Sequence, residues 1–328
     1  MAKIFAAGKV PDKAITLLNK YDVEVFDDSE ALMTEEKLKN KVQDIDALLS
    51  PLSTPVTKEV INHAKKLKII ANLGAGFDNI AIDCAKERNI YVTNTPGVST
   101  SATADLTLGL ILSAARRIPE GDKLCRTKGF NGWAPLFFLG TDLAGKTLGI
   151  IGLGSIGQAV AKRAKAFDMN VIYTGPKQKP KALEEALNAH YVSQHELLEQ
   201  ADFISIHAPY SPALHHLFDK EAFKRMKPTA YLINAARGPI VNEKDLAHAL
   251  EVGEIKGAAL DVFEFEPEIT HELKTLNNVV LTPHIGNATI ETRDAMAEIA
   301  AKNIIAVLNG DEPLTPVFNI SDQQPLMI

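Results

Sequence analysis

The sequence predicts an α/β protein built from two doubly wound parallel sheets, and three observations support this fold class. Short apolar runs of four to eight residues recur along almost the whole chain, and most of them end in Gly, Pro, Asn or His. Amphipathic segments of about 10–20 residues separate these runs, as in consecutive β-α-β units. The runs are continuously apolar rather than alternating, which is typical of strands that are covered on both faces.

The first predicted strands precede Pro96. They are the runs IFAAG, ALLSPL, IIANLG and YVTNTP, which can form one small sheet. The segment from Ser99 to Ile118 has small and apolar residues and a Ser/Thr-rich start, so it predicts a long buried helix. Residues 129–145, rich in Gly, Pro and aromatic residues, are interpreted as a long loop. The later strands are the runs TLGIIGLG, NVIYTG, FISIHAP, AYLINAA, GAALDVF and VVLTPHIG.

The arrangement of these elements predicts two domains. A length of 328 residues suits this number, because domains average about 150 residues. The last amphipathic segment, TIETRDAMAEIAAKNIIAVLNG, follows the final strand, and we expect it to pack back on the first domain. We therefore predict a discontinuous domain of residues 1–100 plus 288–328, with a second domain of residues 101–287 inserted into it.

Composition excludes several classes of protein. The hydrophobic fraction of 46% and the charged fraction of 23% are ordinary for a globular chain. A formal net charge of -6 argues against nucleic-acid binding. The longest apolar stretch, Leu106–Ala115, is about half of a membrane span, and the first apolar run is too short for a signal peptide. The two cysteines cannot form a disulfide framework, so we expect a cytoplasmic protein without membrane contact.

A dinucleotide-binding signature follows the first strand of the second group. Gly152, Gly154 and Gly157 have the G-x-G-x-x-G spacing between a β run and an amphipathic helix. The first glycine allows a tight turn, the second lets a pyrophosphate approach the backbone, and the third lets helix and strand pack closely. The helix N-terminus would then face the phosphates. This context predicts a Rossmann domain, the simpler alternative being a glycine-rich turn without a ligand.

The end of the next strand bears on the choice of coenzyme. A carboxylate there would bind the 2′-hydroxyl of the adenosine ribose. This chain instead has Thr174, Gly175 and Pro176, followed by Lys177 and Lys179. Two lysines without a carboxylate favour NADP(H), although NAD(H) is possible and the lysines could simply be solvated. Asp168 precedes the strand and is therefore at the wrong end.

Three polar residues stand at the ends of later strands. They are Arg237 in INAARG, Glu266 in ALDVFEFEP and His284 in LTPHIG. Ligands bind at the carboxyl ends of strands in open α/β sheets, so the three side chains can converge. Arginine binds a carboxylate or carbonyl through two donors, histidine exchanges protons near neutral pH, and a neighbouring glutamate fixes the tautomer and favours the imidazolium.

Each of these residues also has a simpler explanation. His284 could be a strand-end histidine satisfied by backbone, Arg237 a surface ion-pair residue, and Glu266 a solvated acid. Their shared position relative to a dinucleotide fold favours a hydride-transfer site for a 2-oxo acid. His215 and His216 suggest a metal site, but no third residue accompanies them at metal-ligand spacing, so we predict no metal. Glu184 and Glu185 are expected on a solvated helix face.

The chain resembles the D-isomer-specific 2-hydroxyacid dehydrogenase family over nearly its full length. The motifs that carry the resemblance are GLGSIGQAVAKRAKAF, HAPYSP, MKPTAYLINAARGPIVNEKDLAHAL, GAALDVFEFEP and TPHIGNATIETR. The segments FNGWAPLFFLGTDLAGKTLGIIGLG and YTGPKQKP are most similar to the glyoxylate/hydroxypyruvate reductases. The resemblance implies a Rossmann cofactor domain inserted into a flavodoxin-like substrate domain, and a homodimer.

The resemblance also implies the site residues. Arg237, Glu266 and His284 would be the catalytic set, with His284 as the proton donor. Leu73, Gly74, Ala75 and Gly76 would hold the substrate carboxylate, and Trp133 would reach the active site of the partner subunit. The expected cofactor contacts are Thr103, Gly152, Gly154, Ser155, Ile156, Gly157, Thr174, Gly175, Pro176, Lys177, Lys179, His207, Ala208, Pro209, Ala235, Ala236, Asp261 and Gly286.

These features predict an enzyme that reduces glyoxylate or hydroxypyruvate to the D-2-hydroxy acid. Pyruvate, giving D-lactate, or a bulkier 2-oxo acid is an alternative substrate. A protein of another class, a corepressor-like NAD(H) sensor, is a weaker alternative because such relatives usually carry additional tails. Three departures from the family pattern, Leu214, Asn242 and Asn287, do not touch the catalytic set.

Overall fold

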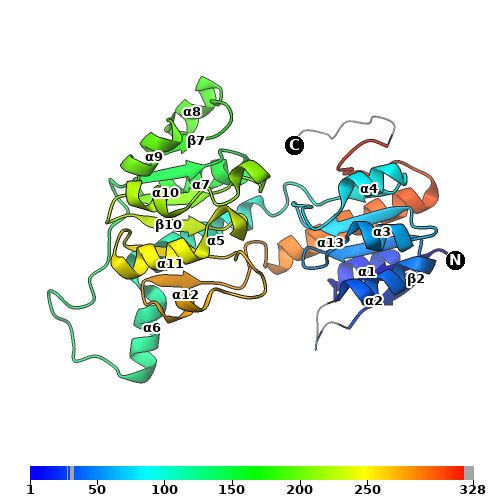
Figure 1. The fold of residues 1–328 in the computed structure, drawn as a ribbon, viewed down its shortest axis with the longest axis horizontal. Helices are drawn as coiled ribbons and strands as arrows, with labels where there is room; N and C mark the ends of the chain where they lie inside the picture. Colours follow the sequence, from blue (N-terminus) through cyan, green and yellow to red (C-terminus); the bar gives the residue numbers. More distant parts are fainter. Residues whose placement is uncertain (28, 30–32, 321–328) are drawn as a thin grey trace. The chain divides into compact units, whose positions relative to one another are not determined.

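A computed structural model describes residues 1–27, 29 and 33–320 of the chain. The chain divides into two compact units, Met1–Ser99 with Ala288–Ile328, and Thr100–Asn287 (Figure 1). Residues 321–328, which the sequence assigns to the first domain, lie outside the described residues. Each unit is built on a parallel sheet, which confirms the predicted α/β class with two doubly wound sheets.

In the described residues, the sheet of the first unit has five strands. Their order across the sheet is β2-β1-β3-β4-β5, the flavodoxin-like order. The order reverses between β1 and β3, so ligands of such a sheet would bind beyond the carboxyl ends of these strands or their neighbours. The strands are β1 (Lys3–Ala6), β2 (Asp22–Val25), β3 (Ala47–Pro51), β4 (Ile69–Leu73) and β5 (Tyr91–Thr93).

Helices cover both faces of this sheet. Adjacent residues of β1 show the division, because Ile4 packs in the cluster that contains Leu18 and Ile304, while Phe5 packs with Leu38 and Ile61. The first face is covered by α1 (Asp12–Leu18) and α13 (Ile290–Asn309). The second face is covered by α2 (Glu35–Lys41), α3 (Lys58–His63) and α4 (Ile82–Glu87), with a 3₁₀ turn at Val42–Asp44.

The described sheet of the second unit has seven strands in the order β12-β11-β10-β9-β6-β7-β8. This is the Rossmann order with one further strand, and it reverses between β6 and β9. All pairs are parallel, so the carboxyl ends of the strands lie along one edge. The strands are β6 (Thr147–Ile151), β7 (Asn170–Thr174), β8 (Ala189–Tyr191), β9 (Phe203–Ile206), β10 (Tyr231–Asn234), β11 (Gly257–Leu260) and β12 (Val279–Leu281).

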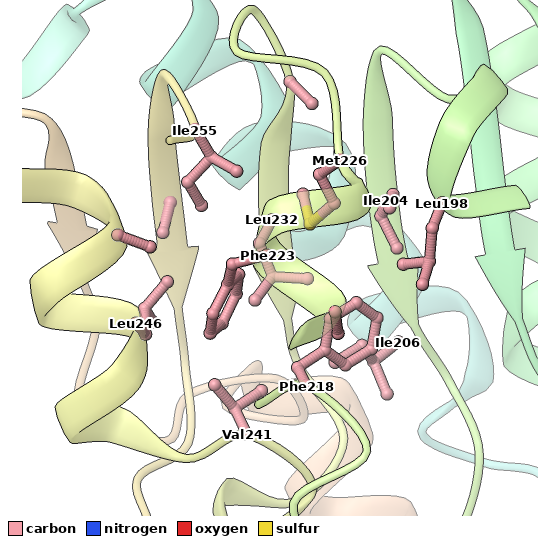
Figure 2. Packing of buried hydrophobic residues seen from close by; sticks show 14 of the residues in the cluster. Leu198, Ile204, Ile206, Phe218, Phe223, Met226, Leu232, Val241, Leu246 and Ile255 are labelled. Atoms are coloured by element: carbon pink, nitrogen blue, oxygen red, sulfur yellow. The ribbon is translucent and has the colours of Figure 1, made fainter. Parts of the chain in front are cut away.

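Two apolar clusters fix the helices of the second unit to its sheet. Figure 2 shows one of them, in which Phe218, Phe223 and Leu246 pack over the strand residues Ile204 and Leu232. This face carries α9 (Gln194–Gln200), α10 (Lys220–Arg225), α11 (Glu243–Val252) and α12 (His271–Thr275). The other face carries α5 (Thr100–Arg116), α7 (Ser155–Lys165) and α8 (Lys181–Leu187).

The segment after α5 leaves the body of the second unit. Helix α6 (Ile118–Thr127) has no buried residue among its described positions. The predicted loop at residues 129–145 follows it, and Trp133 is 87% exposed there. Within this loop Phe130 stacks on Phe137 with the ring centroids 6.4 Å apart. The segment therefore presents aromatic side chains to solvent in the isolated chain.

Two strands of the structure were not predicted from the sequence. Each of the predicted runs contains a strand, but β2 and β8 were not expected, and both lie at a sheet edge. Edge strands are covered less, and accordingly β2 is mostly exposed and reads DVEV, without a continuous apolar run. Among the described helices, none combines the length and the apolar character needed to cross a membrane.

Candidate active site

The glycine-rich turn between β6 and α7 is shaped by close contacts. Gly152 has φ +92°, and a Cβ atom there would lie 2.8 Å from the backbone nitrogen of Ala208. A Cβ at Gly157 would lie 2.3 Å from the carbonyl oxygen of Gly152. A Cβ at Gly154 would meet no described atom within 4 Å. The turn is thus closed against its own sheet and open at Gly154, where a ligand could approach the backbone.

This turn fits the pyrophosphate of a dinucleotide. Gly154 is the N-cap of α7, and no described side chain caps the helix there. The first backbone N–H groups of an uncapped helix are orphan donors with a partial positive charge, which suits phosphate. Ser155, Ile156 and Gly157, the predicted cofactor contacts, are the residues that carry them. The pyrophosphate contact stays a prediction.

Two tyrosine hydroxyls hold the backbone of the loop after β7. The hydroxyl of Tyr173 accepts a hydrogen bond from the backbone N–H of Lys179 and donates one to Glu184, both at 2.7 Å. Tyr191 donates to the carbonyl oxygen of Gly175 at 3.0 Å. Burial, together with the bond to Glu184, raises the pKa of Tyr173 to about 12, so the hydroxyl keeps its proton.

Two predictions about this loop have different outcomes. Glu184 is half-buried and accepts hydrogen bonds from Tyr173 and Gln178, so the expectation of a solvated glutamate was wrong for this residue. These hydrogen bonds lower its pKa. Lys177 is exposed and Lys179 half-buried at the carboxyl end of β7. Their contact with a 2′-phosphate stays a prediction.

His207, at the carboxyl end of β9, is suited to line the predicted cofactor site and not to act as an acid or base. Burial lowers its pKa to about 4, so the imidazole is neutral near pH 7. Its Nε2 lies 2.7 Å from Ser205 Oγ, while Nδ1 is buried without a partner among the described residues. An unpartnered buried nitrogen beside the glycine-rich turn is compatible with the predicted cofactor contact.

Glu266 and His284 form a pair. His284 Nδ1 lies 2.9 Å from Glu266 Oε2, and Glu266 Oε1 accepts the backbone N–H of Phe263 at 2.9 Å. Burial alone would raise the pKa of Glu266. The hydrogen bond and charge of His284, the Phe263 N–H and the charge of Arg237 together outweigh burial, so the pKa of Glu266 is lowered. Glu266 is therefore a carboxylate that orients His284 through Nδ1 and leaves Nε2 for a ligand.

A buried carboxylate holds the turn that carries His284. Asp261 is 1% exposed and accepts hydrogen bonds from the backbone N–H groups of Ile285 and Gly286, both at 2.8 Å. It also accepts the hydroxyl of Thr282 at 2.6 Å. His284 itself has φ +53°, a conformation that costs free energy for a residue with a side chain. Asp261 thus offsets that cost; its predicted contact with the cofactor stays a prediction.

Arg237 is placed by two neighbours. The buried side chain of Asn234 donates to the carbonyl oxygen of Arg237 at 2.9 Å and accepts the N–H of Ala236 at 3.0 Å. A Cβ at Gly238 would lie 1.9 Å from the carbonyl carbon of Phe263, so only glycine lets this loop rest on the strand end that leads to Glu266. Arg237 lies near enough for its charge to lower the pKa of Glu266.

The three predicted catalytic side chains therefore come from one edge of one sheet. They follow β10, β11 and β12, which are adjacent and parallel. The other predicted cofactor residues of this unit also follow strand ends or line them, with Thr103 on α5 near Gly286. Pro209, Ala235 and Ala236 lie in the loops after β9 and β10. Sequence reasoning did not single out Asn234, whose only signal is a polar residue at the end of an apolar run.

The predicted carboxylate-binding loop lies in the first unit, after β4. Its carbonyl oxygens are engaged: Gly74 accepts from the N–H of Thr95, Ala75 from the side chain of Asn94, and Gly76 from the side chain of Asn72. A trans peptide directs each N–H opposite to the preceding carbonyl. The N–H groups that follow these carbonyls therefore point away from these partners. Their contact with a substrate carboxylate stays a prediction. Leu73 ends β4 and is buried.

Two predictions concern groups outside this edge. No group of three or more His, Cys, Asp or Glu within the described residues could hold a metal ion. His215 and His216 instead stack on one another with their ring centroids 3.9 Å apart. Trp133 lies in the exposed loop after α6, and its contact with a partner subunit stays a prediction.

Comparison with known proteins defines the family. The model of the D-isomer specific 2-hydroxyacid dehydrogenase NAD-binding domain matches residues 108–286, more than half of the chain. A protein of Staphylococcus saprophyticus classed as a 2-hydroxyacid dehydrogenase is 59% identical over 315 residues, covering 95% of this chain and 98% of that protein.

Solved structures agree with this result. The TT0316 protein of Thermus thermophilus is 42% identical with a TM-score of 0.91, covering 96% of this chain and 100% of that chain. The NADPH-dependent glyoxylate/hydroxypyruvate reductase of Sinorhizobium meliloti, in complex with NADP and malonate, is 29% identical with a TM-score of 0.83 and 99% coverage of both chains. The chain therefore belongs to the D-isomer specific 2-hydroxyacid dehydrogenase family.

Proposed function

We propose that this protein reduces a small 2-oxo acid, glyoxylate or hydroxypyruvate, to the D-2-hydroxy acid with NADPH. The observation that carries the proposal is the Glu266–His284 pair beside Arg237, on the sheet whose glycine-rich turn fits a dinucleotide. This unit also matches the NAD-binding domain of the family. When bound, the nicotinamide supplies the hydride; the residues of the chain bind the substrate and supply the proton.

Arg237 and His284 divide the work on the substrate. The guanidinium of Arg237 binds the carboxylate and the polarised carbonyl oxygen of the 2-oxo acid through parallel donors. His284 donates the proton on Nε2 to the carbonyl oxygen as negative charge develops there. Glu266 accepts from Nδ1 throughout, so the ring keeps one orientation before and after proton transfer. The N–H groups of the Leu73–Gly76 loop would bind the substrate carboxylate.

The coenzyme choice rests on the loop after β7. A carboxylate that would repel a 2′-phosphate is absent from residues 174–179, while Lys177 and Lys179 can attract it. Tyr173 and Tyr191 hydrogen-bond the backbone of this loop at Lys179 and Gly175, which supports its conformation from the side of the sheet. The Sinorhizobium meliloti reductase, which has NADP bound, gives a structural precedent at the level of the family.

We also propose that the protein works as a homodimer in the cytoplasm. The exposed aromatic residues of the loop after α6, Phe130, Trp133 and Phe137, would be covered by the partner, and Trp133 would reach its active site. Sedimentation of the parent and of Trp133→Ala tests this, because a monomeric parent with full activity contradicts it.

A panel of 2-oxo acids tests the proposed function. Glyoxylate, hydroxypyruvate, pyruvate and a bulkier branched 2-oxo acid are each mixed with NADPH and with NADH, and consumption of the reduced coenzyme is followed by absorbance. We expect the highest kcat/KM for glyoxylate or hydroxypyruvate with NADPH. A higher value for pyruvate or the bulkier acid would identify another member activity of the family. Coenzyme binding without turnover of any acid would instead support an NAD(H)-sensing protein.

A further inference from the structure

His216 lies between two loops that carry the proposed catalytic residues. It belongs to the segment after β9, whereas Arg237 follows β10 and Glu266 follows β11. His216 has φ +53°, so its backbone is held in a left-handed conformation that a histidine rarely adopts. Such local strain persists only where surrounding contacts enforce it. The contacts of His216 show which loops enforce it.

The backbone of this segment is tied to the Arg237 loop. The N–H of His216 donates to the carbonyl oxygen of Pro239 at 2.9 Å. Two residues later Phe218 donates to Ile240 at 3.1 Å and accepts from Asn242 at 3.0 Å. These bonds form a short parallel bridge beside the 3₁₀ turn Gly238–Ile240, which begins directly after Arg237. A shift of His216 would therefore displace the residues that directly follow Arg237.

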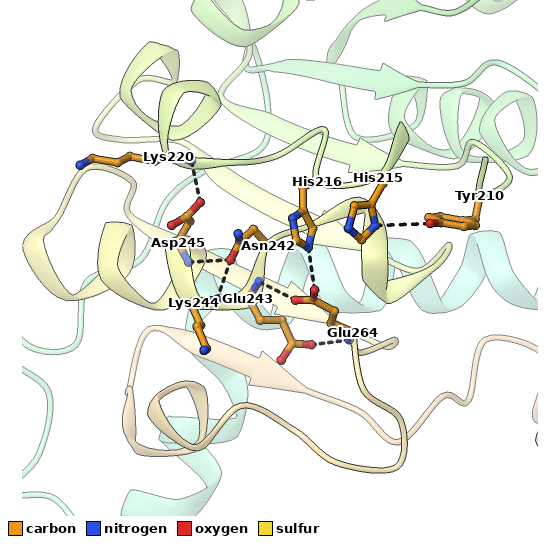
Figure 3. A network of polar contacts seen from close by, with 9 residues as sticks. All are labelled: Tyr210, His215, His216, Lys220, Asn242, Glu243, Lys244, Asp245 and Glu264. Carbon is orange, nitrogen blue, oxygen red and sulfur yellow. Dashed lines mark hydrogen bonds and ion pairs between the residues drawn. The ribbon is translucent and has the colours of Figure 1, made fainter. Parts of the chain in front are cut away.

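The side chain of His216 is tied to the Glu266 loop. Its Nε2 lies 2.6 Å from Oε1 of Glu264, whose side chain is only 10% exposed (Figure 3). Glu264 also accepts the N–H of Glu243 at 3.3 Å. The buried carboxyl group of Glu243 in turn accepts the N–H of Glu264 at 2.6 Å and of Thr270 at 3.1 Å. Both ends of the segment 264–270, which contains Glu266, are thus fastened to the start of α11.

The same place is where the two loops touch. Gly238 rests against the backbone of Phe263 and Glu264, with no room for a Cβ. The N–H of Phe263 is the donor that holds Glu266. A shift of Glu264 would therefore displace both the contact with Gly238 and the donor to Glu266.

We propose that His216 and Glu264 form a positioning clamp that sets the spacing between Arg237 and the Glu266–His284 pair. The inference rests on the proposed function, since it assumes those three residues act on the substrate. It assigns a role to one member of the His215–His216 pair only. His215 is exposed and its nearest polar contact is the hydroxyl of Tyr210 at 3.3 Å, so it lies outside the clamp.

Substitutions at adjacent positions test the clamp. His216→Phe keeps a ring for stacking but removes the donor, and His216→Asn suits the left-handed backbone but is too short to reach Glu264. His216→Gln places an N–H donor near the position of Nε2. His215→Phe is the matched control, because it changes the neighbouring ring and leaves the bond to Glu264 intact. For each variant, kcat, KM for the 2-oxo acid, Kd for NADPH and Tm are measured.

We expect His216→Phe and His216→Asn to lower kcat by about 10- to 100-fold, because a misplacement of about 1 Å in a reacting group can cost this much. Kd for NADPH should stay within about twofold, His216→Gln should recover kcat to within about threefold of the parent, and His215→Phe should match the parent. Should the Phe variant fail to fold, the Asn and Gln variants still decide. Equal losses in the Asn and Gln variants, or none in either, would overturn the clamp.

Hydrogen–deuterium exchange separates this inference from the proposed function. Loss of the clamp should speed amide exchange in residues 236–241 and 262–268 in the Asn variant and not in His215→Phe. If the parent consumes coenzyme with none of the acids, the proposed function fails, while these exchange rates still judge the clamp. Unchanged exchange in both segments contradicts the clamp, whatever the activity.

Discussion

Two parts of the same sheet edge are held in different ways. Behind the proposed acid–base residues, the carboxyl groups of Asp261 and Glu243 are buried and bind backbone N–H groups. Behind the proposed coenzyme loop, the hydroxyls of Tyr173 and Tyr191 hold the backbone, while Lys177 is exposed and Lys179 is half-buried. Removing a buried hydrogen-bond acceptor costs considerable free energy of folding, whereas removing an exposed charge costs little. The carboxylates that support the proposed acid–base residues are therefore part of the core, whereas the lysines proposed to choose the coenzyme are not.

The largest effect is expected at His284, the proposed proton donor. His284→Ala should lower kcat for glyoxylate reduction by about 10²–10⁴, because a positioned acid contributes this much to a rate. Coenzyme binding should stay nearly intact, since Asp261 holds the turn through backbone groups. Stopped-flow turnover and a fluorescence titration of NADPH measure the two effects. A variant within threefold of the parent would remove His284 from the mechanism.

Lysine should not replace Arg237, the proposed substrate-binding residue. Arg237→Lys should lose about 10- to 100-fold in kcat/KM for the 2-oxo acid and recover little relative to Arg237→Ala. Lysine supplies a point charge and lacks the two parallel donors. Steady-state kinetics with both variants decide the matter, and parental values in the Lys variant would refute two-pronged recognition.

Substitutions in the proposed coenzyme loop should change the coenzyme preference without loss of catalysis. Replacing Lys177 and Lys179 together with Ala should reduce kcat/KM for NADPH by about tenfold to a hundredfold, with NADH nearly unaffected, since each exposed contact to a phosphate is worth about 1 kcal/mol or slightly more. Thr174→Asp should raise the NADH/NADPH ratio further. The two coenzymes are compared in each protein at saturating substrate, and equal use of both coenzymes by the parent would contradict a phosphate site.

The smallest effect concerns pH and stability. His207 has a folded pKa of about 4 against an ordinary value of 6.5, so below pH 6.5 the unfolded chain binds a proton that the folded chain does not. Stability due to this residue is therefore present above pH 6.5 and is lost as the pH falls toward 4. Between pH 7 and pH 5 the loss should be at most about 2 kcal/mol. Urea unfolding at both pH values tests this, with His207→Gln expected to show a smaller difference.

Much of the fold was predictable because buried parallel strands leave a simple pattern. The apolar runs mark their strands, and the polar residues Arg237 and His284 follow the ends of β10 and β12 by three residues each. β2 and β8 left no such pattern, since an edge strand is not covered enough to require a continuous apolar run. The separation of Glu266 and His284 along the sequence likewise does not give the distance between their side chains. They pair at 2.9 Å because β11 and β12 are adjacent in the sheet.

The supporting residues could not be predicted from the sequence. Asn234, Glu243 and Glu264 are ordinary polar residues until the chain buries them and turns backbone N–H or carbonyl groups toward them. The partners of Glu243 and Glu264 lie 21 residues away, so no local pattern encodes these bonds, and the bond of Asn234 to Arg237 depends on the turn that follows β10. Glu184, near the proposed coenzyme loop, is a similar case. The pattern of its helix does not reveal that the hydroxyl of Tyr173 donates a hydrogen bond to Glu184.

The contact at Gly238 has a consequence for how this chain can vary. A side chain of any size would meet the backbone of Phe263 at 1.9 Å, and backbone has no rotamer with which to yield. At Gly154, by contrast, a Cβ meets nothing described within 4 Å. In a library of all single substitutions, position 238 should accept glycine alone even in a screen for folded protein. Position 154 should accept several residues in that screen and reject them only when growth or selection depends on coenzyme turnover.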